Sequence, residues 1–258
     1  MSSASPTSDA RAPAIVILAD DLSGAADCGV ACTELGLQTV VALRSVHATS
    51  DAEALAIDAN TRTMTATKAA EVTEHLALSY RDHCLVFKKL DSTLRGHLGP
   101  ELGAVLRARR TVQREAVIIV APAFPALGRT TVNGHQHLHG VPLERAEIWR
   151  REQSDETASI PAMLEVRGLR TSLLPLHKVR ADIETLSARL DKLSDACDVI
   201  VCDAETDLDL AAIAASSLRL GSRALCAGSA GLARQLVEAA RLSKPRASPA
   251  TPAIESAR

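Results

Sequence analysis

The chain has 258 residues, and its 29 Lys and Arg against 31 Asp and Glu give a formal net charge of −2. That balance provides no basic surface for nucleic acid or an anionic membrane, and with only 2% aromatic residues base-stacking platforms are not expected. Apolar residues make up 47% of the chain, enough for a large aliphatic core, so we expect a soluble globular protein and not a disordered chain or a membrane protein.

The first half of the chain alternates short apolar runs with longer helical stretches. Unbroken apolar strands between helices are typical of a parallel sheet that is covered on both faces. We therefore predict an α/β fold with a doubly wound, mostly parallel sheet. The predicted strands are Ala14–Ala19, Thr39–Leu43, Ala54–Asp58, Cys84–Leu90 and Ala116–Ala121, and the helices run to Leu35, over Thr65–Tyr80 and over Gly99–Arg109.

The alternation is interrupted between Pro122 and Arg170. Thr131–His135 contains an Asn-Gly turn signal, and Leu143–Leu169 is polar and uneven, which predicts a hairpin and an excursion beside the carboxyl edge of the sheet. The alternation then resumes. The remaining predicted strands are Ser172–Leu176, Val199–Cys202 and Ala224–Cys226, and the helices are Asp182–Leu193, Leu208–Leu218 and Gly231–Ala240.

The ends of the chain and its cysteines give weaker predictions. Residues 1–13 lack the basic start and apolar stretch of a signal peptide, and no apolar run is long enough to span a bilayer, so we expect a cytoplasmic protein. Residues 243–258 are rich in Pro, Ala and Ser and are expected to form a disordered tail after a domain over residues 14–242. The six cysteines form no Cys-x-x-Cys pair, which favours buried reduced thiols.

A pair of carboxylates, Asp20 and Asp21, follows the first predicted strand and precedes a helix. Ligands of parallel sheets bind outside the carboxyl ends of the strands, where such a pair can accept hydrogen bonds from substrate hydroxyls or act as a base. The alternative is structural, because Asp is a common cap of a helix N-terminus.

Two further polar clusters follow predicted strands. Lys88–His97 brings Asp91, Ser92 and Arg95 into a turn before a helix, although Asp91 or Ser92 could simply cap that helix. Arg129 follows the strand at Ala116–Ala121. Arginine forks bind carboxylates, so two arginines and hydroxyls beside two aspartates fit a small polyhydroxy acid better than a dinucleotide.

A fourth cluster, Gly228–Gly231, lies between a strand and a helix and includes Ser229. Gly228 and Gly231 would let backbone N–H groups approach an anion, although a tight turn needs glycine in any case. Ala227 occupies the first glycine position of a nucleophile elbow, so serine hydrolysis through Ser229 is disfavoured. A metal site is not predicted either, because no carboxylate or cysteine is spaced to complete one with His135, His137 and His139.

Together these clusters resemble the N-terminal domain of the four-carbon acid sugar kinase family. The matching stretches are Ala19–Asp27, Lys88–Gly96, Ala121–Thr131, Gly140–Leu143 and Gly228–Leu232. Members of that family phosphorylate acids such as threonate, erythronate or 3-oxo-tetronates with ATP and Mg²⁺. The resemblance implies that Ser229 touches the nucleotide and that the acid substrate lies among Asp21, Asp91, Ser92, Arg95 and Arg129.

The sequence departs from the family pattern at several positions. Ser23 stands where Thr is usual, a mild change that keeps the hydroxyl. His97 stands where Asn is common and Asn133-Gly134-His135 replaces Gly-Gly-Tyr, and these two changes would affect the choice of substrate. The resemblance also implies a C-terminal domain with most of the ATP site, for which we find no counterpart after residue 242.

Two hypotheses about function follow. In the first, the chain is the acid-binding half of a kinase and acts with a nucleotide-binding subunit. Asp21, with Asp91 as the alternative, would then orient or deprotonate the acceptor hydroxyl. In the second, the chain is a non-catalytic sugar-acid binding module or an inactive remnant. Co-purification of a nucleotide-binding partner separates the two.

Overall fold

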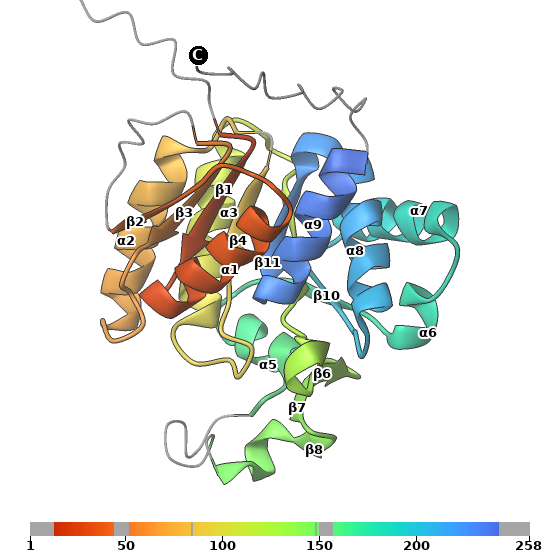
Figure 1. The fold of residues 1–258 in the computed structure, drawn as a ribbon. Helices are drawn as coiled ribbons and strands as arrows, with labels where there is room; N and C mark the ends of the chain where they lie inside the picture. The colour runs from red at the N-terminus through yellow and green to blue at the C-terminus, as the bar shows by residue number, and fades with distance from the viewer. Residues whose placement is uncertain (1–12, 44–51, 84, 148, 150–156, 243–258) are drawn as a thin grey trace, which may run out of the picture.

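Eight parallel strands form the central sheet of the computed structural model, which describes residues 13–43, 52–83, 85–147, 149 and 157–242 (Figure 1). Their spatial order is β2-β3-β1-β4-β11-β5-β10-β9, so the last strand of the chain lies in the middle of the sheet. The bounds are β1 Ile15–Ala19, β2 Thr39–Leu43, β3 Ala54–Asp58, β4 Val86–Lys89, β5 Val117–Ala121, β9 Thr171–Leu174, β10 Val199–Cys202 and β11 Ala224–Gly228. The predicted parallel α/β sheet is confirmed.

Helices cover both faces of the sheet (Figure 1). One face carries α1 Leu22–Glu34, α6 Leu176–Val179, α7 Ile183–Ser194, α8 Asp207–Arg219 and α9 Ala230–Leu242. The other carries α2 Ala66–Ser79, α3 Leu98–Arg110 and α5 Ile160–Glu165.

Successive side chains of a strand enter opposite cores. In β1, Ile15 and Ile17 pack under the first set of helices while Val16 and Leu18 pack under the second, and all four are buried. This double burial explains why the strand sequence is apolar without interruption.

Several helices begin at residues that the sequence provides as caps. The Asp21 carboxylate accepts a hydrogen bond from the Gly24 N–H, and Asp182 does the same for Thr185 in α7. Thr206 and Asp209 form a reciprocal capping box at the start of α8. Such caps stabilise a helix by about 1 kcal/mol each.

A small antiparallel sheet, the flap, projects from the carboxyl edge of the large sheet (Figure 1). It consists of β6 Arg129–Val132, β7 His135–Leu138 and β8 Val141–Pro142. Asn133 and Gly134 connect β6 to β7 with φ values of 50° and 74°, the left-handed geometry that a two-residue hairpin turn requires. The predicted hairpin is confirmed. Single 3-10 turns occur at η1 Pro125–Leu127, η2 Leu143–Arg145 and η3 Gly221–Arg223.

The differences from the predicted elements are local. The region Leu143–Leu169 contains the helix α5, which was not predicted. This helix has only six residues, with a proline in its first turn, and is too short to show a helical period. The strand predicted to end at Leu176 ends at Leu174, because Pro175 precedes a helix that starts at Leu176. Among the described residues, no helix has the length and apolarity needed to cross a bilayer.

Burial of the cysteines is confirmed for the thiols within the described part of the chain. Those residues are free and buried: Cys28, Cys32, Cys197, Cys202 and Cys226. Burial raises the pKa of Cys28 to about 12, which keeps that thiol protonated and unreactive at neutral pH. Cys84, residues 1–12 and residues 243–258 lie outside the described residues, so the predictions for them stay predictions.

Candidate active site at the carboxyl edge of the sheet

Four neighbouring strands, β1, β4, β11 and β5, bring the predicted clusters to one edge. Asp20 and Asp21 follow β1, Asp91 and Ser92 follow β4, and Ser229 follows β11. The flap begins at Arg129, shortly after β5. The expected convergence at the carboxyl ends is therefore found.

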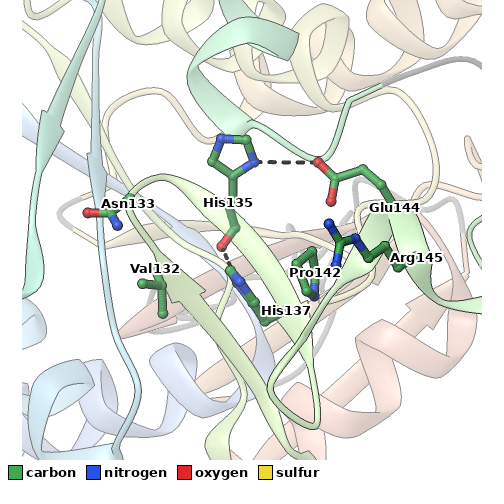
Figure 2. A pocket seen from close by; sticks show the side chains of 7 residues that line it. All are labelled: Val132, Asn133, His135, His137, Pro142, Glu144 and Arg145. Carbon is green, nitrogen blue, oxygen red and sulfur yellow. Dashed lines mark hydrogen bonds and ion pairs between the residues drawn. The ribbon is translucent and has the colours of Figure 1, made fainter.

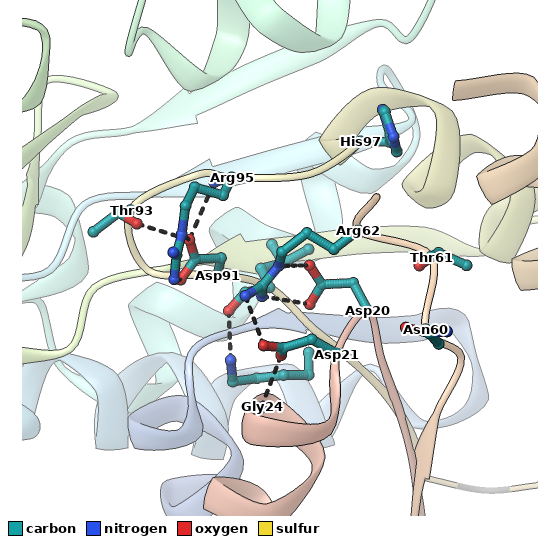
Figure 3. Close-up of polar contacts among 12 residues, drawn as sticks. Asp20, Asp21, Gly24, Asn60, Thr61, Arg62, Asp91, Thr93, Arg95 and His97 are labelled. Atoms are coloured by element: carbon teal, nitrogen blue, oxygen red, sulfur yellow. Dashed lines mark hydrogen bonds and ion pairs between the residues drawn. The ribbon is translucent and has the colours of Figure 1, made fainter. Parts of the chain in front are cut away.

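Arg62, in the loop after β3, holds both carboxylates of the first cluster (Figure 3). Its Nε and Nη2 donate to the two oxygens of Asp20 at 2.8 and 3.1 Å, and its Nη1 donates to Asp21 Oδ2 at 2.6 Å. Asp21 Oδ1 meanwhile accepts from the Gly24 N–H at 2.8 Å. The capping alternative thus holds for Asp21, and its second oxygen faces the site together with Asp20.

Asp91 organises the loop after β4 (Figure 3). Its carboxylate accepts from Thr93 Oγ1 at 2.7 Å and from Arg95 Nε at 2.5 Å. Burial alone would raise the pKa of Asp91, but the hydrogen bonds from Arg95 and Thr93 and the charges of Arg95 and Arg62 outweigh it and lower the pKa to about 2. Asp91 is therefore an anion at every physiological pH.

The same loop contains a strained residue. Leu94 has φ of 58° and is 1% exposed, a left-handed conformation that costs a non-glycine residue about 1 kcal/mol or more. The surroundings fix it, because the Leu94 N–H donates to Asp91 O at 2.9 Å and its side chain lies in the core. Helix α3 then starts at Leu98 with His97 at its cap position, so the alternative that Asp91 or Ser92 caps this helix is wrong.

The flap closes over Ser92. Arg129 Nη1 donates to Ser92 Oγ at 2.7 Å, and Gln136 Nε2 donates to the Ser92 carbonyl at 2.8 Å. Gln136 in turn accepts from the Thr131 hydroxyl at 2.8 Å, so its side chain connects Thr131 of the hairpin to the β4 loop. The Nε of Arg129 is buried without a hydrogen-bond partner, and this arginine forms no ion pair with a described carboxylate.

Asp203, at the end of β10, anchors the turn of the hairpin. Its two oxygens accept from the N–H groups of Asn133 and Gly134, each at 2.8 Å. The side chain is 1% exposed, and burial raises the pKa of Asp203 against the opposing effect of these backbone donors. Asp203 thus fixes the turn of the flap to the large sheet, and paired backbone hydrogen bonds between Thr131 and Ala204 add to this attachment.

The Gly228–Gly231 cluster lies where β11 passes into α9. A methyl group on Gly228 would lie 2.2 Å from the Ala121 carbonyl oxygen, so this close strand contact requires glycine. Ser229 is 0% exposed, donates to Ala123 O at 2.5 Å and accepts from the Gly231 N–H at 3.1 Å. The structural role of the turn is clear, and the nucleotide contact expected of Ser229 stays a prediction.

The cavities differ in size on the two sides of the flap. A void of only about 10 Å³ lies among Asp20, Asp91, Arg95 and Glu101, so the arginine–carboxylate pairs fill the space between the loops. A hollow of about 520 Å³ lies on the outer face of the flap and is lined by Val132, Asn133, His135, His137, Pro142, Glu144 and Arg145 (Figure 2).

The histidines of β7 belong to that outer hollow. His135 Nδ1 lies 3.4 Å from Glu144 Oε1, and His137 Nδ1 lies 3.1 Å from the His135 carbonyl (Figure 2). Across the described residues, no group of three or more His, Cys, Asp or Glu side chains could hold a metal ion.

Sequence reasoning missed Arg62, Gln136 and Asp203. Arg62 follows the strand Ala54–Asp58, so the rule that identified Asp20 and Asp91 could have identified it. Gln136 and Asp203 had no comparable signal, because their roles depend on how the hairpin packs against the large sheet.

The fold and the edge cluster belong to a known class of domain. A family described as "sugar-binding N-terminal domain" matches residues 15–236, which is most of the chain. The chain therefore belongs to the sugar-binding N-terminal domains of the four-carbon acid sugar kinase family, as the motifs predicted.

Two of the relatives that this chain resembles are kinases of four-carbon acids. A D-threonate kinase from Cupriavidus necator is 42% identical over 228 residues, which cover 86% of this chain and 53% of the relative. A D-erythronate kinase from Heliobacterium modesticaldum is 30% identical over 78% of this chain and 47% of the relative. The chain thus spans about half the length of the curated relatives that it matches.

A solved structure has the same fold. The chain from Bordetella bronchiseptica, a domain-swapped dimer with bound citrate, has a TM-score of 0.76 and 29% identity. The match covers 88% of this chain and 56% of that one. The bound citrate is described for the Bordetella bronchiseptica protein only.

Proposed function

We propose that this chain binds four-carbon sugar acids, D-threonate foremost, and forms the acid-binding half of an ATP-dependent kinase. The observation that carries the proposal is a cation, Arg129, with a buried unpartnered Nε and no carboxylate partner among the described residues. The Arg129 guanidinium donates a hydrogen bond to the hydroxyl of Ser92, the residue after Asp91. A ligand with one carboxylate and several hydroxyls complements this combination. The 42% identity to a D-threonate kinase favours that acid.

The residues of the edge then take separate roles. Arg129 binds the carboxylate of the acid. Arg95, which is hydrogen-bonded to Asp91, contributes a second positive charge to the binding of this carboxylate. Asp20 accepts hydrogen bonds from the hydroxyls of the acid, and the Ser92 hydroxyl donates hydrogen bonds to them or accepts from them. Asp21 orients the acceptor hydroxyl and receives its proton, while Arg62 fixes the direction of its carboxylate.

Phosphoryl transfer needs a donor that these residues alone do not supply. As the acceptor oxygen bonds to the γ-phosphorus of ATP, the bond from that phosphorus to the β–γ bridging oxygen breaks and the hydroxyl proton passes to Asp21. We assign the nucleotide to the Gly228–Gly231 turn together with a nucleotide-binding domain outside the matched stretch. Mg²⁺ accompanies ATP in such reactions, and we propose no ligand for it among the described residues.

Calorimetric titration with D-threonate, D-erythronate and 3-oxo-tetronate tests the proposal. We expect saturable binding of at least D-threonate, weakened about tenfold or more by Asp21→Asn. The amide keeps an oxygen to cap α1, so this variant removes charge at the site and leaves the helix start intact.

Asp182→Asn is the matched control, because Asp182 caps α7 through the same contact at the same 2.8 Å distance. It should leave binding unchanged. Absence of heat with all three acids, or equal loss in both variants, would contradict the proposal. Binding without ATP turnover, even in the presence of any co-purifying nucleotide-binding protein, would instead support the non-catalytic module.

A further inference from the structure

The last two residues of β4 are both buried lysines, and their environments differ. Lys88 is 2% exposed, and its ammonium lies 3.3 Å from the carboxylate of Glu101, which is also buried. Lys89 is 6% exposed, points to the opposite face of the sheet, and donates to the Leu90 carbonyl at 3.0 Å. Within the described residues, Lys89 has no ion pair with any carboxylate.

The carboxylates at this edge have direct cationic partners other than Lys89. Asp20 and Asp21 are bound by Arg62, and Asp91 is bound by Arg95. Leaving N–H groups of a buried ammonium without hydrogen bonds is costly, and the Leu90 carbonyl satisfies only one of the three. Two N–H groups of Lys89 therefore have no hydrogen-bond partner among the described residues and are available to a ligand.

The position of Lys89 indicates which ligand group this is. A methyl group on Gly24 would lie only 3.0 Å from the Lys89 Nζ and 2.8 Å from Asp21 Oδ1, so the ammonium lies at the N-terminal turn of α1 beside the proposed proton acceptor. On its other side Lys89 is in register with Gly228 of β11, directly before α9. The helices α1 and α9 pack together (Figure 1). A lysine at a helix N-terminus is an arrangement suited to phosphate.

At the carboxyl edge, Lys89 and Arg129 both lack an ion pair with a described carboxylate, and they come from different elements. Arg129 offers a planar fork, which matches a carboxylate, and Lys89 offers a compact point charge. A kinase that acts on a sugar acid must bind two anionic groups, the carboxylate and the transferring phosphoryl group.

We propose that Lys89 is a catalytic residue that binds the non-bridging oxygens of the transferring phosphoryl group, a role that rests on the proposed function. Its ammonium makes and breaks no covalent bond. It offsets the negative charge on the phosphoryl oxygens while the acceptor oxygen bonds to phosphorus and the nucleoside diphosphate leaves.

Lys89→Met tests this, with inorganic phosphate and D-threonate as separate calorimetric probes of the purified chain. We expect phosphate affinity to fall at least tenfold and D-threonate affinity to change less than twofold. Removing an unpaired buried charge should also leave the melting temperature equal to or above that of wild type. Lys68→Met, which removes an exposed lysine charge, is the control and should change none of the three readings.

Any of four results would overturn the assignment. Three concern affinity: a wild-type chain that does not bind phosphate, phosphate affinity that Lys89→Met leaves unchanged, and D-threonate affinity that falls as far as phosphate affinity. A melting temperature several degrees lower would show that the ammonium is structural, which also overturns it. If phosphate binding depends on Lys89 while D-threonate does not bind wild type, the acid specificity fails and the phosphoryl site stands.

Discussion

At the scale of single residues, Asp91 connects the stability of the site to pH. Its folded pKa of about 2 lies below the ordinary value of 3.8, so its contribution is present above pH 3.8 and is lost as pH falls through about 2. The shift corresponds to about 2 kcal/mol. In urea unfolding, Asp91→Asn should lower the free energy of unfolding at pH 7, and the difference from wild type should shrink between pH 5 and pH 2.

Asp198 provides the matched control for that prediction. Burial would raise its pKa, but hydrogen bonds from Arg170 and Arg110 lower it to about 2, as in Asp91. It directly precedes β10 and therefore lies at the amino edge, away from the site. Asp198→Asn should show the same dependence of stability on pH with D-threonate affinity unchanged. A pH-independent difference for Asp91→Asn would contradict its assignment as a paired buried anion.

At the scale of elements, Asp203 attaches the turn of the flap to the large sheet. Asp203→Ala leaves the N–H groups of Asn133 and Gly134 without their acceptor, at a cost of about 1–3 kcal/mol for each group that stays buried. We expect faster amide hydrogen exchange over residues 129–138 and unchanged exchange in β1 and β5. Exchange that rises equally in those core strands would show global destabilisation and not release of the flap.

Elements also show what the sequence could predict. The strands β1 and β5 are unbroken apolar runs, because both of their faces are buried, and that pattern is visible without coordinates. Asp20, Asp91 and Arg129 were predicted because strand ends of a parallel sheet share one edge. Helix α5 is too short to show a period, and the contacts of Gln136 and Asp203 depend on strand neighbours far apart in the sequence, so neither could be predicted.

At the scale of the whole molecule, the site joins distant parts of the chain. Asp20 and Asp21 follow the first strand, and Arg129 begins the flap beyond β5, with β4 and β11 between them in the sheet. A ligand that contacts both ends would stabilise the sheet as a unit, because it binds only when all of these loops are in place. Unfolding of the liganded protein should therefore remain one cooperative transition.

The size of the stabilisation expected from bound D-threonate follows from mass action. D-threonate at 100 times its dissociation constant adds about 2.7 kcal/mol to the free energy of unfolding, which for a chain of this size raises the melting temperature by about 5–10 °C. Differential scanning calorimetry with sodium chloride at matched ionic strength separates specific binding from screening of charge. Asp21→Asn should lose most of the increase and Asp182→Asn should keep it. An equal increase with sodium chloride, or in both variants, would mean that the acid does not bind at the carboxyl edge.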